Sequence, residues 1–200
     1  MKVVDAKLLE RRAIKIQSSE QSSEQSSEQT ANMIHVVLDI NGVLINRIWR
    51  KSDQPLNEYD NGIPMKTKAG CMHIFIRPGA IEFLRAIVDN GCTLVFWSSM
   101  TREYMMPIVN LLIDKAKLKE EWFPRVLCQT DCQAVPHPDP EIKYKPLFLK
   151  DEKRIYERYP NTDGVIFIDD GPLKMQLNED SEIIIVPSWD MKNDPGMCDK

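Results

Sequence analysis

The segment IHVVLDINGVL (residues 34–44) decides the fold class, because an apolar run ends there in a carboxylate and a glycine-containing turn. Ile34–Leu38 is apolar apart from His35, which is typical of a parallel strand buried on both faces. Asp39 follows directly, and Gly42 lies in the turn after it. Ligands of open α/β sheets bind beyond the carboxyl ends of the strands, so Asp39 is the first candidate for a functional residue.

Similar apolar runs recur along the chain and alternate with amphipathic segments. They predict strands at about 74–76, 93–97, 125–128, 165–168 and 183–186, and helices at about 77–90, 101–119, 149–158 and after Pro172. This alternation predicts an α/β domain with a Rossmann-like parallel sheet flanked by helices. Residues 47–72 are polar with little periodicity, so we expect a small inserted loop or hairpin there and no large cap.

The composition fits one folded domain that follows a polar segment. The chain has 200 residues, of which 42% are hydrophobic, enough to bury one core. Residues 18–29 read SSEQ three times, which predicts a flexible linker. We therefore expect an N-terminal helix or tail with a disordered linker over residues 1–32, and the folded domain over residues 33–200.

Charge, hydropathy and cysteine content exclude some classes of binding partner and predict a cellular location. The net charge of −4 and the scattered basic residues argue against nucleic acid as a direct partner, and no apolar run has transmembrane length. Five cysteines without regular spacing predict free thiols and an intracellular location, in the cytoplasm or the nucleus. A mitochondrial location is an alternative, because residues 1–16 are rich in Lys and Arg, although Asp5 and Glu10 are unusual in a transit peptide.

Polar side chains end or follow several of the predicted strands. A carboxylate at Asp39 is suited to attack phosphorus and form an aspartyl-phosphate. Further acids near Asp39 need a positive partner, and Mg²⁺ bound by oxygen ligands supplies one. A hydroxyl and a lysine would stabilise the phosphoryl oxygens, and Gly42 would let the backbone approach the phosphate. The candidate residues are Asp39, Asn41, Ser98, Lys150, Asp169 and Asp170.

Their order resembles the four motifs of the haloacid-dehalogenase superfamily. Finer features resemble the phosphatases of the RNA polymerase II C-terminal domain, also called the NLI-interacting-factor-like family. The resemblance covers roughly residues 34–190, and each of its motifs is weak alone. The segments that carry it are IRPG (76–79) with EFL (82–84), WSSM (97–100) with Tyr104, KPLFLKD (145–151) and IDDGP (168–172).

The resemblance implies a role for each candidate residue. Asp39 would be the nucleophile, and Ser98 and Lys150 would hold the phosphate. Magnesium would be held by Asp39, the backbone carbonyl of Asn41, and Asp169 or Asp170. The substrate would be phosphoserine or phosphothreonine in a protein or peptide, bound in an open cleft, and the loop between Cys128 and Lys145 would help to select it.

One position departs from the pattern of active members. Asn41 stands where those proteins have a second aspartate, the general acid, and loss of such a group costs about 10²–10⁴-fold in rate. The resemblance therefore implies a slow or selective phosphatase. The alternative is a phosphatase-fold module that binds proteins, similar to the mitochondrial inner-membrane import receptor subunit. A small-molecule phosphatase ranks last, because residues 47–72 are too few for a substantial cap.

Overall fold

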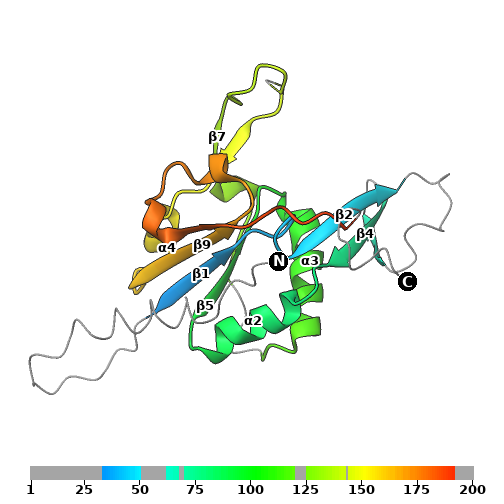
Figure 1. Ribbon diagram of the computed structural model, residues 1–200, viewed down its shortest axis with the longest axis horizontal. Helices are drawn as coiled ribbons and strands as arrows, with labels where there is room; N and C mark the ends of the chain where they lie inside the picture. The colour runs from blue at the N-terminus through cyan, green and yellow to red at the C-terminus, as the bar shows by residue number, and fades with distance from the viewer. Residues whose placement is uncertain (1–32, 51–61, 68–69, 120–124, 143, 192–200) are drawn as a thin grey trace, which may run out of the picture. The chain divides into compact units, whose positions relative to one another are not determined.

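The computed structural model describes residues 33–50, 62–67, 70–119, 125–142 and 144–191 (Figure 1). These residues all belong to one compact unit, Asn32–Lys200. The predicted N-terminal tail and SSEQ linker lie outside the described residues and stay a prediction. Within the described part of the chain, no helix has the length and apolar character to cross a membrane. The cysteines at positions 71, 92, 128 and 132 are free thiols.

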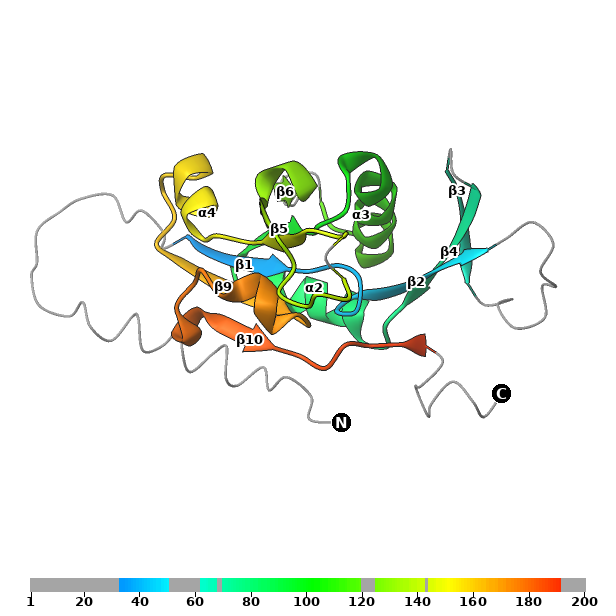
Figure 2. The ribbon, with the colours of Figure 1, turned by 90° about the horizontal axis from the view of Figure 1, so that it is seen from above.

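Five parallel strands form the central sheet (Figures 1 and 2). Their order is β10 (Ile183–Ile185), β9 (Gly164–Asp169), β1 (Ile34–Leu38), β5 (Thr93–Trp97) and β6 (Arg125–Leu127). The predicted bounds of β1 and β5 are confirmed. β6 and β10 each end one residue earlier than predicted, and β9 extends one residue further at both ends. The continuous apolar runs are explained by burial, because every β1 residue after Ile34 is buried although their side chains alternate between two faces.

Helices flank this sheet, as predicted. α2 (Ala80–Asp89) buries one stripe of its surface and packs against β5 and against α3 (Arg102–Ala116). Thr101 is the N-cap residue of α3, but its hydroxyl makes no capping hydrogen bond. α4 (Lys153–Arg158) is shorter than predicted, because Leu149 belongs to a strand instead.

The insertion after β1, expected as a small loop or hairpin, is a three-stranded antiparallel sheet. β4 (Gly70–Ile76) lies between β2 (Ile45–Arg50) and β3 (Ile63–Thr67). This sheet lies beside α3 in Figures 1 and 2, and the Trp49 ring of β2 meets the Tyr104 ring of α3 edge-on, with centroids 5.7 Å apart. The insertion is small, as expected, and it places β2 next to the end of β1.

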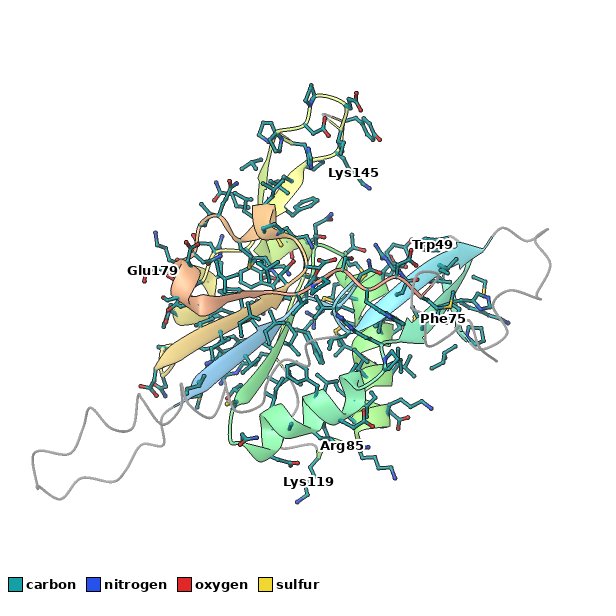
Figure 3. All side chains as sticks on the ribbon, viewed as in Figure 1. Trp49, Phe75, Arg85, Lys119, Lys145 and Glu179 are labelled. Carbon is teal, nitrogen blue, oxygen red and sulfur yellow. The ribbon has the colours of Figure 1, made fainter. Side chains whose placement is uncertain are left out.

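The sequence did not predict a hairpin within the proline-rich stretch. It consists of β7 (Gln133–Val135) and β8 (Leu147–Leu149), and its connecting loop extends away from the central sheet, with Lys145 near the base of that loop (Figure 3). Three-residue strands carry too little periodicity to be recognised among prolines. The hairpin matters for function because β8 leads directly into Lys150.

Trp97 and Phe167 anchor the core beneath the carboxyl ends of β5 and β9. Their ring centroids are 6.1 Å apart, and both side chains are buried with Val37, Leu127 and Ile155. The indole Nε1–H of Trp97 donates to Cys132 Sγ at 3.2 Å, so the polar atom of this tryptophan is satisfied. A packed core at this level holds the strand ends in place.

His35 is buried in β1 and should make the stability of the fold depend on pH. Burial, reinforced by the positive charge of Arg125, lowers the pKa of His35 from 6.5 to about 4. Between these values the unfolded chain binds a proton that the folded chain excludes. We expect the free energy of unfolding to fall by about 2–3 kcal/mol as the pH drops from about 6.5 to about 4.

Urea denaturation at several pH values measures this loss. The control is His35→Phe, which keeps an aromatic ring against Tyr159, whose ring centroid lies 5.4 Å from that of His35. Since other groups titrate similarly in both proteins, the difference between the two pH profiles isolates His35. Parallel profiles would show that His35 does not contribute.

Candidate phosphoryl-transfer site

The candidate residues meet at the carboxyl edge of the central sheet. Asp39 follows β1, and its backbone N–H donates to the carbonyl of Ile168 in β9 at 3.0 Å. Asp169 ends β9, and Ser98 follows β5, which also pairs with β1. β1 therefore lies between the strands that carry the other two polar side chains, so three segments distant in the sequence contribute to one edge.

Lys150, which directly follows β8, contacts two of these carboxylates. Its Nζ lies 3.3 Å from Asp39 Oδ1 and 2.5 Å from Asp169 Oδ2. The side chains of all three residues are almost fully buried, and that of Lys150 is 1% exposed. Because a buried charge is costly without partners, this arrangement requires all three groups to be present together.

Lys174 is a further charged residue of the candidate site, and the sequence analysis did not select it. Its Nζ lies 2.9 Å from Asp39 Oδ2, 3.3 Å from Asp169 Oδ1 and 3.3 Å from Asp170 Oδ1. A 3-10 turn, Pro172–Met175, brings the lysine back over the acids that precede it. The sequence did contain one signal for this contact. Pro172 predicts the start of a helical turn, and a lysine four residues after an acid can pair with that acid within such a turn, as Lys174 does with Asp170.

These charges shift the pKa values within the site. Burial alone would raise the pKa of Asp39, but Lys150 and Lys174 outweigh burial and lower it, so Asp39 is ionised. For Asp169, burial and the charge of Asp39 raise the pKa against the opposing effect of the lysines. For Lys174, burial would lower the pKa, but the surrounding carboxylates reverse this and raise it.

Arg47 of β2 brings a third positive charge near Asp39. Burial lowers the pKa of Arg47, and the negative charge of Asp39 opposes that shift, so the two groups interact electrostatically. The sequence placed residue 47 in an irregular insertion and offered no reason to select it. Its position follows from β2, which begins at Ile45, immediately after the turn that Asp39 enters.

Gly42 lets Asp170 approach the turn after β1. Its φ is +86°, and a Cβ atom there would lie 2.1 Å from Asp170 Oδ2. The same oxygen accepts a hydrogen bond from Ser188 Oγ at 2.6 Å, and the Trp189 N–H donates to the Gly42 carbonyl at 2.7 Å. We expected glycine here to admit a phosphate, whereas the space next to it is filled by the Asp170 carboxylate.

Asn41 and Ser98 lie at this edge, and within the described part of the chain no hydrogen bond or ion pair joins their side chains to the charged cluster. Asn41 Oδ1 is buried and has no hydrogen-bond partner among the described residues. Ser98 is buried, and its Oγ accepts a hydrogen bond from the Met100 N–H at 3.4 Å. The structure thus brings Asp39, Lys150, Asp169 and Asp170 together. It places Ser98 directly after β5, the strand that pairs with β1.

The donor atoms fit a hard divalent cation. Carboxylate oxygens of Asp39, Asp169 and Asp170 lie within 4.8 Å of one another. Asn41 Oδ1 is a further buried oxygen at this edge, and it accepts no hydrogen bond from the part of the chain that the structure describes. Oxygen donors of this kind are the ligands that Mg²⁺ prefers. The ammonium group of Lys174 contacts the same three carboxylates.

Comparison with solved structures shows the fold. The chain is similar to the RNA polymerase II CTD phosphatase Fcp1 of fission yeast, in a variant bound to beryllium fluoride, with 17% identity and a TM-score of 0.57. A second structure of Fcp1, described as an essential RNA polymerase II CTD phosphatase, gives the same values. Each match covers 92% of this chain and 46% of the other, so this chain spans about half the length of those proteins.

Sequence comparison shows the family. No curated protein matches the chain significantly. Residues 34–198, which include every candidate residue of the site, match the family model described as NLI interacting factor-like phosphatase. The resemblance stated from the motifs is therefore confirmed, and the chain belongs to the NLI interacting factor-like phosphatase family.

Proposed function

We propose that the protein is a magnesium-dependent phosphoprotein phosphatase that acts through an aspartyl-phosphate at Asp39. The observation that carries this proposal is an ionised, buried carboxylate held between two lysine ammonium groups. Asp39 Oδ1 is ion-paired with Lys150 Nζ at 3.3 Å but accepts no hydrogen bond among the described residues, so we take it as the oxygen that would bond to phosphorus. The family to which the chain belongs supports the same class of reaction.

In the first step, Asp39 forms a P–O bond as the bond between phosphorus and the serine or threonine oxygen breaks. Lys150 and the Ser98 hydroxyl would stabilise the phosphoryl oxygens. Mg²⁺, held by Asp39, the Asn41 carbonyl and Asp169 or Asp170, would neutralise phosphoryl charge when bound. In the second step, water attacks phosphorus, phosphate leaves, and the Asp39 carboxylate is restored.

Asn41 makes both steps slow. The leaving alkoxide needs a proton, and the attacking water must lose one. An amide side chain can neither donate the first proton nor accept the second. The two lysines nearest Asp39 are paired with carboxylates, so they do not replace the missing acid. A substrate with an acidic leaving group, such as p-nitrophenyl phosphate, depends little on this proton, so it should be hydrolysed faster than a phosphoserine peptide.

The small size of the elements around the site supports a protein substrate. The insertion is a small sheet, and the β7–β8 hairpin extends from the segment that carries Lys150 (Figure 3). Neither element is a large cap domain. Phosphoserine and phosphothreonine in an extended segment would reach Asp39 between these elements, and the hairpin would contribute to selection. The CTD phosphatase activity in the titles of the similar structures supports this substrate class.

The second candidate function is a module that binds phosphorylated proteins without cleaving them. It is favoured by Asn41 in the acid position and by Lys174 within the carboxylate cluster. Peptide binding that persists in Asp39→Ala and without Mg²⁺ would support this alternative. The presence of Asp39, Lys150, Asp169 and Asp170 together favours the enzyme, because peptide binding alone does not need all four residues.

Beryllium fluoride, which mimics a phosphoryl group on aspartate, tests the proposal directly. With Mg²⁺ and the mimic at about 100 times its dissociation constant, we expect about 2.7 kcal/mol of stabilisation, which raises the melting temperature by roughly 5–10 °C. Asp39→Asn should abolish the shift, because it removes the anionic oxygen that binds the mimic. The exposed Asp89 of α2 provides the control Asp89→Asn.

Hydrolysis of p-nitrophenyl phosphate completes the test. The wild-type protein and Asp89→Asn should release phosphate in the presence of Mg²⁺, and Asp39→Asn should not. Absence of both the thermal shift and turnover in the wild-type protein would refute the enzymatic proposal.

A further inference from the structure

We propose that Lys174 is a built-in cation that competes with the divalent metal for the three carboxylates of the site. The inference rests on the cation site of the proposed function and adds a regulatory step to it. With Lys174 in place, the carboxylate cluster is neutralised internally. Metal binding must then displace the ammonium group, so the affinity for the metal is set by the difference between the two cations.

The contacts of Lys174 coincide with the metal donor set. Its ammonium reaches Asp39, Asp169 and Asp170 at 2.9, 3.3 and 3.3 Å, and these are the same residues whose oxygens lie within 4.8 Å of one another. Lys150 contacts only the first two of them and uses the opposite oxygens, Asp39 Oδ1 and Asp169 Oδ2. A divalent ion bound to the three acids would therefore meet Lys174 and not Lys150.

The two lysines also differ in their freedom to move. The Lys150 side chain is 1% exposed, whereas that of Lys174 is 24% exposed. The backbone around Lys174 is fixed, because the Lys150 N–H donates to its carbonyl at 2.9 Å and its own N–H donates to the Gly171 carbonyl at 2.9 Å. Displacement therefore needs only rotation of a lysine side chain towards solvent, with no change in the main chain.

Gly171 accommodates the aliphatic part of this lysine. A Cβ atom at position 171 would lie 2.9 Å from Lys174 Cε and 3.3 Å from Asp169 Oδ1. The side chain of Lys174 thus passes over a residue without a side chain on its way to the acids. In its inward position, Lys174 therefore packs its aliphatic carbons against Gly171 while its ammonium group pairs with the carboxylates.

Charge balance makes simultaneous occupancy unfavourable. Among the groups in direct contact, three carboxylates face two ammonium groups, which leaves one net negative charge, and the nearby Arg47 adds a further positive charge. A divalent ion sharing the same oxygens with both lysines would make the cluster positive and would place like charges a few ångströms apart. Release of Lys174 removes one of these positive charges, and the released ammonium, at the edge of the site, would then be free to pair with the phosphate of a substrate.

Calorimetric titration of the full chain with Mn²⁺ and with Mg²⁺ tests the competition. Lys174→Met keeps much of the side-chain volume and removes the charge, so it should bind either ion at least 10-fold more tightly than the wild-type protein. Lys115→Met, at an exposed position of α3, is the matched control and should bind like the wild-type protein. Equal or weaker binding by Lys174→Met, or no binding by either protein, would overturn the proposal.

Lysine accessibility in the wild-type protein gives an independent test that requires no variant to fold. Acetic anhydride labelling, read by peptide mass spectrometry, should modify Lys174 several-fold faster when Mg²⁺ is added, because the ammonium is displaced towards solvent. Lys150 should stay protected in both conditions. Labelling of Lys174 that does not change with Mg²⁺ would refute displacement. Neither experiment measures turnover, so failure of the phosphatase assays would leave this result standing.

Discussion

Replacing Asn41 with aspartate is expected to increase the hydrolysis of a phosphoserine peptide by about 10²–10⁴-fold, the usual contribution of a positioned acid–base group. Residue 41 follows Asp39 by two positions, and Asn41 Oδ1 is buried without a hydrogen-bond partner among the described residues. An acid there would protonate the leaving alkoxide and then remove a proton from the attacking water. Steady-state phosphate release with Mg²⁺ measures the effect.

The increase should depend on the leaving group. With p-nitrophenyl phosphate, only the second step needs the acid–base group, so a smaller gain is expected. Asn46→Asp is the matched control, because Asn46 Oδ1 is also buried without a partner but lies on β2. If Asn41→Asp binds beryllium fluoride at Asp39 and yet gains no activity, Asn41 does not occupy the position of the general acid.

Replacing Lys150 with methionine is expected to lower the free energy of unfolding by about 3–5 kcal/mol, because it leaves the buried carboxylates of Asp39 and Asp169 with one contacting ammonium group, that of Lys174, where the native protein has two. Lys150 Nζ lies 3.3 Å from Asp39 and 2.5 Å from Asp169, and its side chain is 1% exposed. A change of this size lowers the melting temperature of a domain of this length by roughly 6–20 °C. Urea denaturation and thermal melting, without metal, provide the measurement.

A double variant separates the loss of charge from the loss of packing. Asp169→Asn removes one of the two acids that Lys150 neutralises, so Lys150→Met combined with Asp169→Asn should recover part of the stability lost by Lys150→Met alone. Lys115→Met again serves as the control for removal of an exposed lysine. A loss below about 1 kcal/mol in Lys150→Met would show that the buried ion pairs do not hold the strand ends together.

The strands of the central sheet were predictable because burial on both faces requires continuous apolar runs. Ile34–Leu38 and Thr93–Trp97 are strands with the predicted bounds. The strand-end rule then selected Asp39, which follows β1, and Asp169, which ends β9. The β7–β8 hairpin and the three-stranded insertion were not predictable in detail, because short or partly exposed strands depend on their pairing partners more than on their own pattern.

The sequence by itself determined the fold class, the family and which acids end the strands, since these depend on local patterns and short motifs. Only the tertiary structure decided which cations meet those acids. Lys174 contacts Asp39 although the two residues are 135 positions apart in the sequence. Arg47 interacts electrostatically with Asp39 because it lies on β2, the first strand of the insertion. The physical reason is that a charge cluster is defined by distances of a few ångströms, and such distances between remote segments are set by strand order and packing.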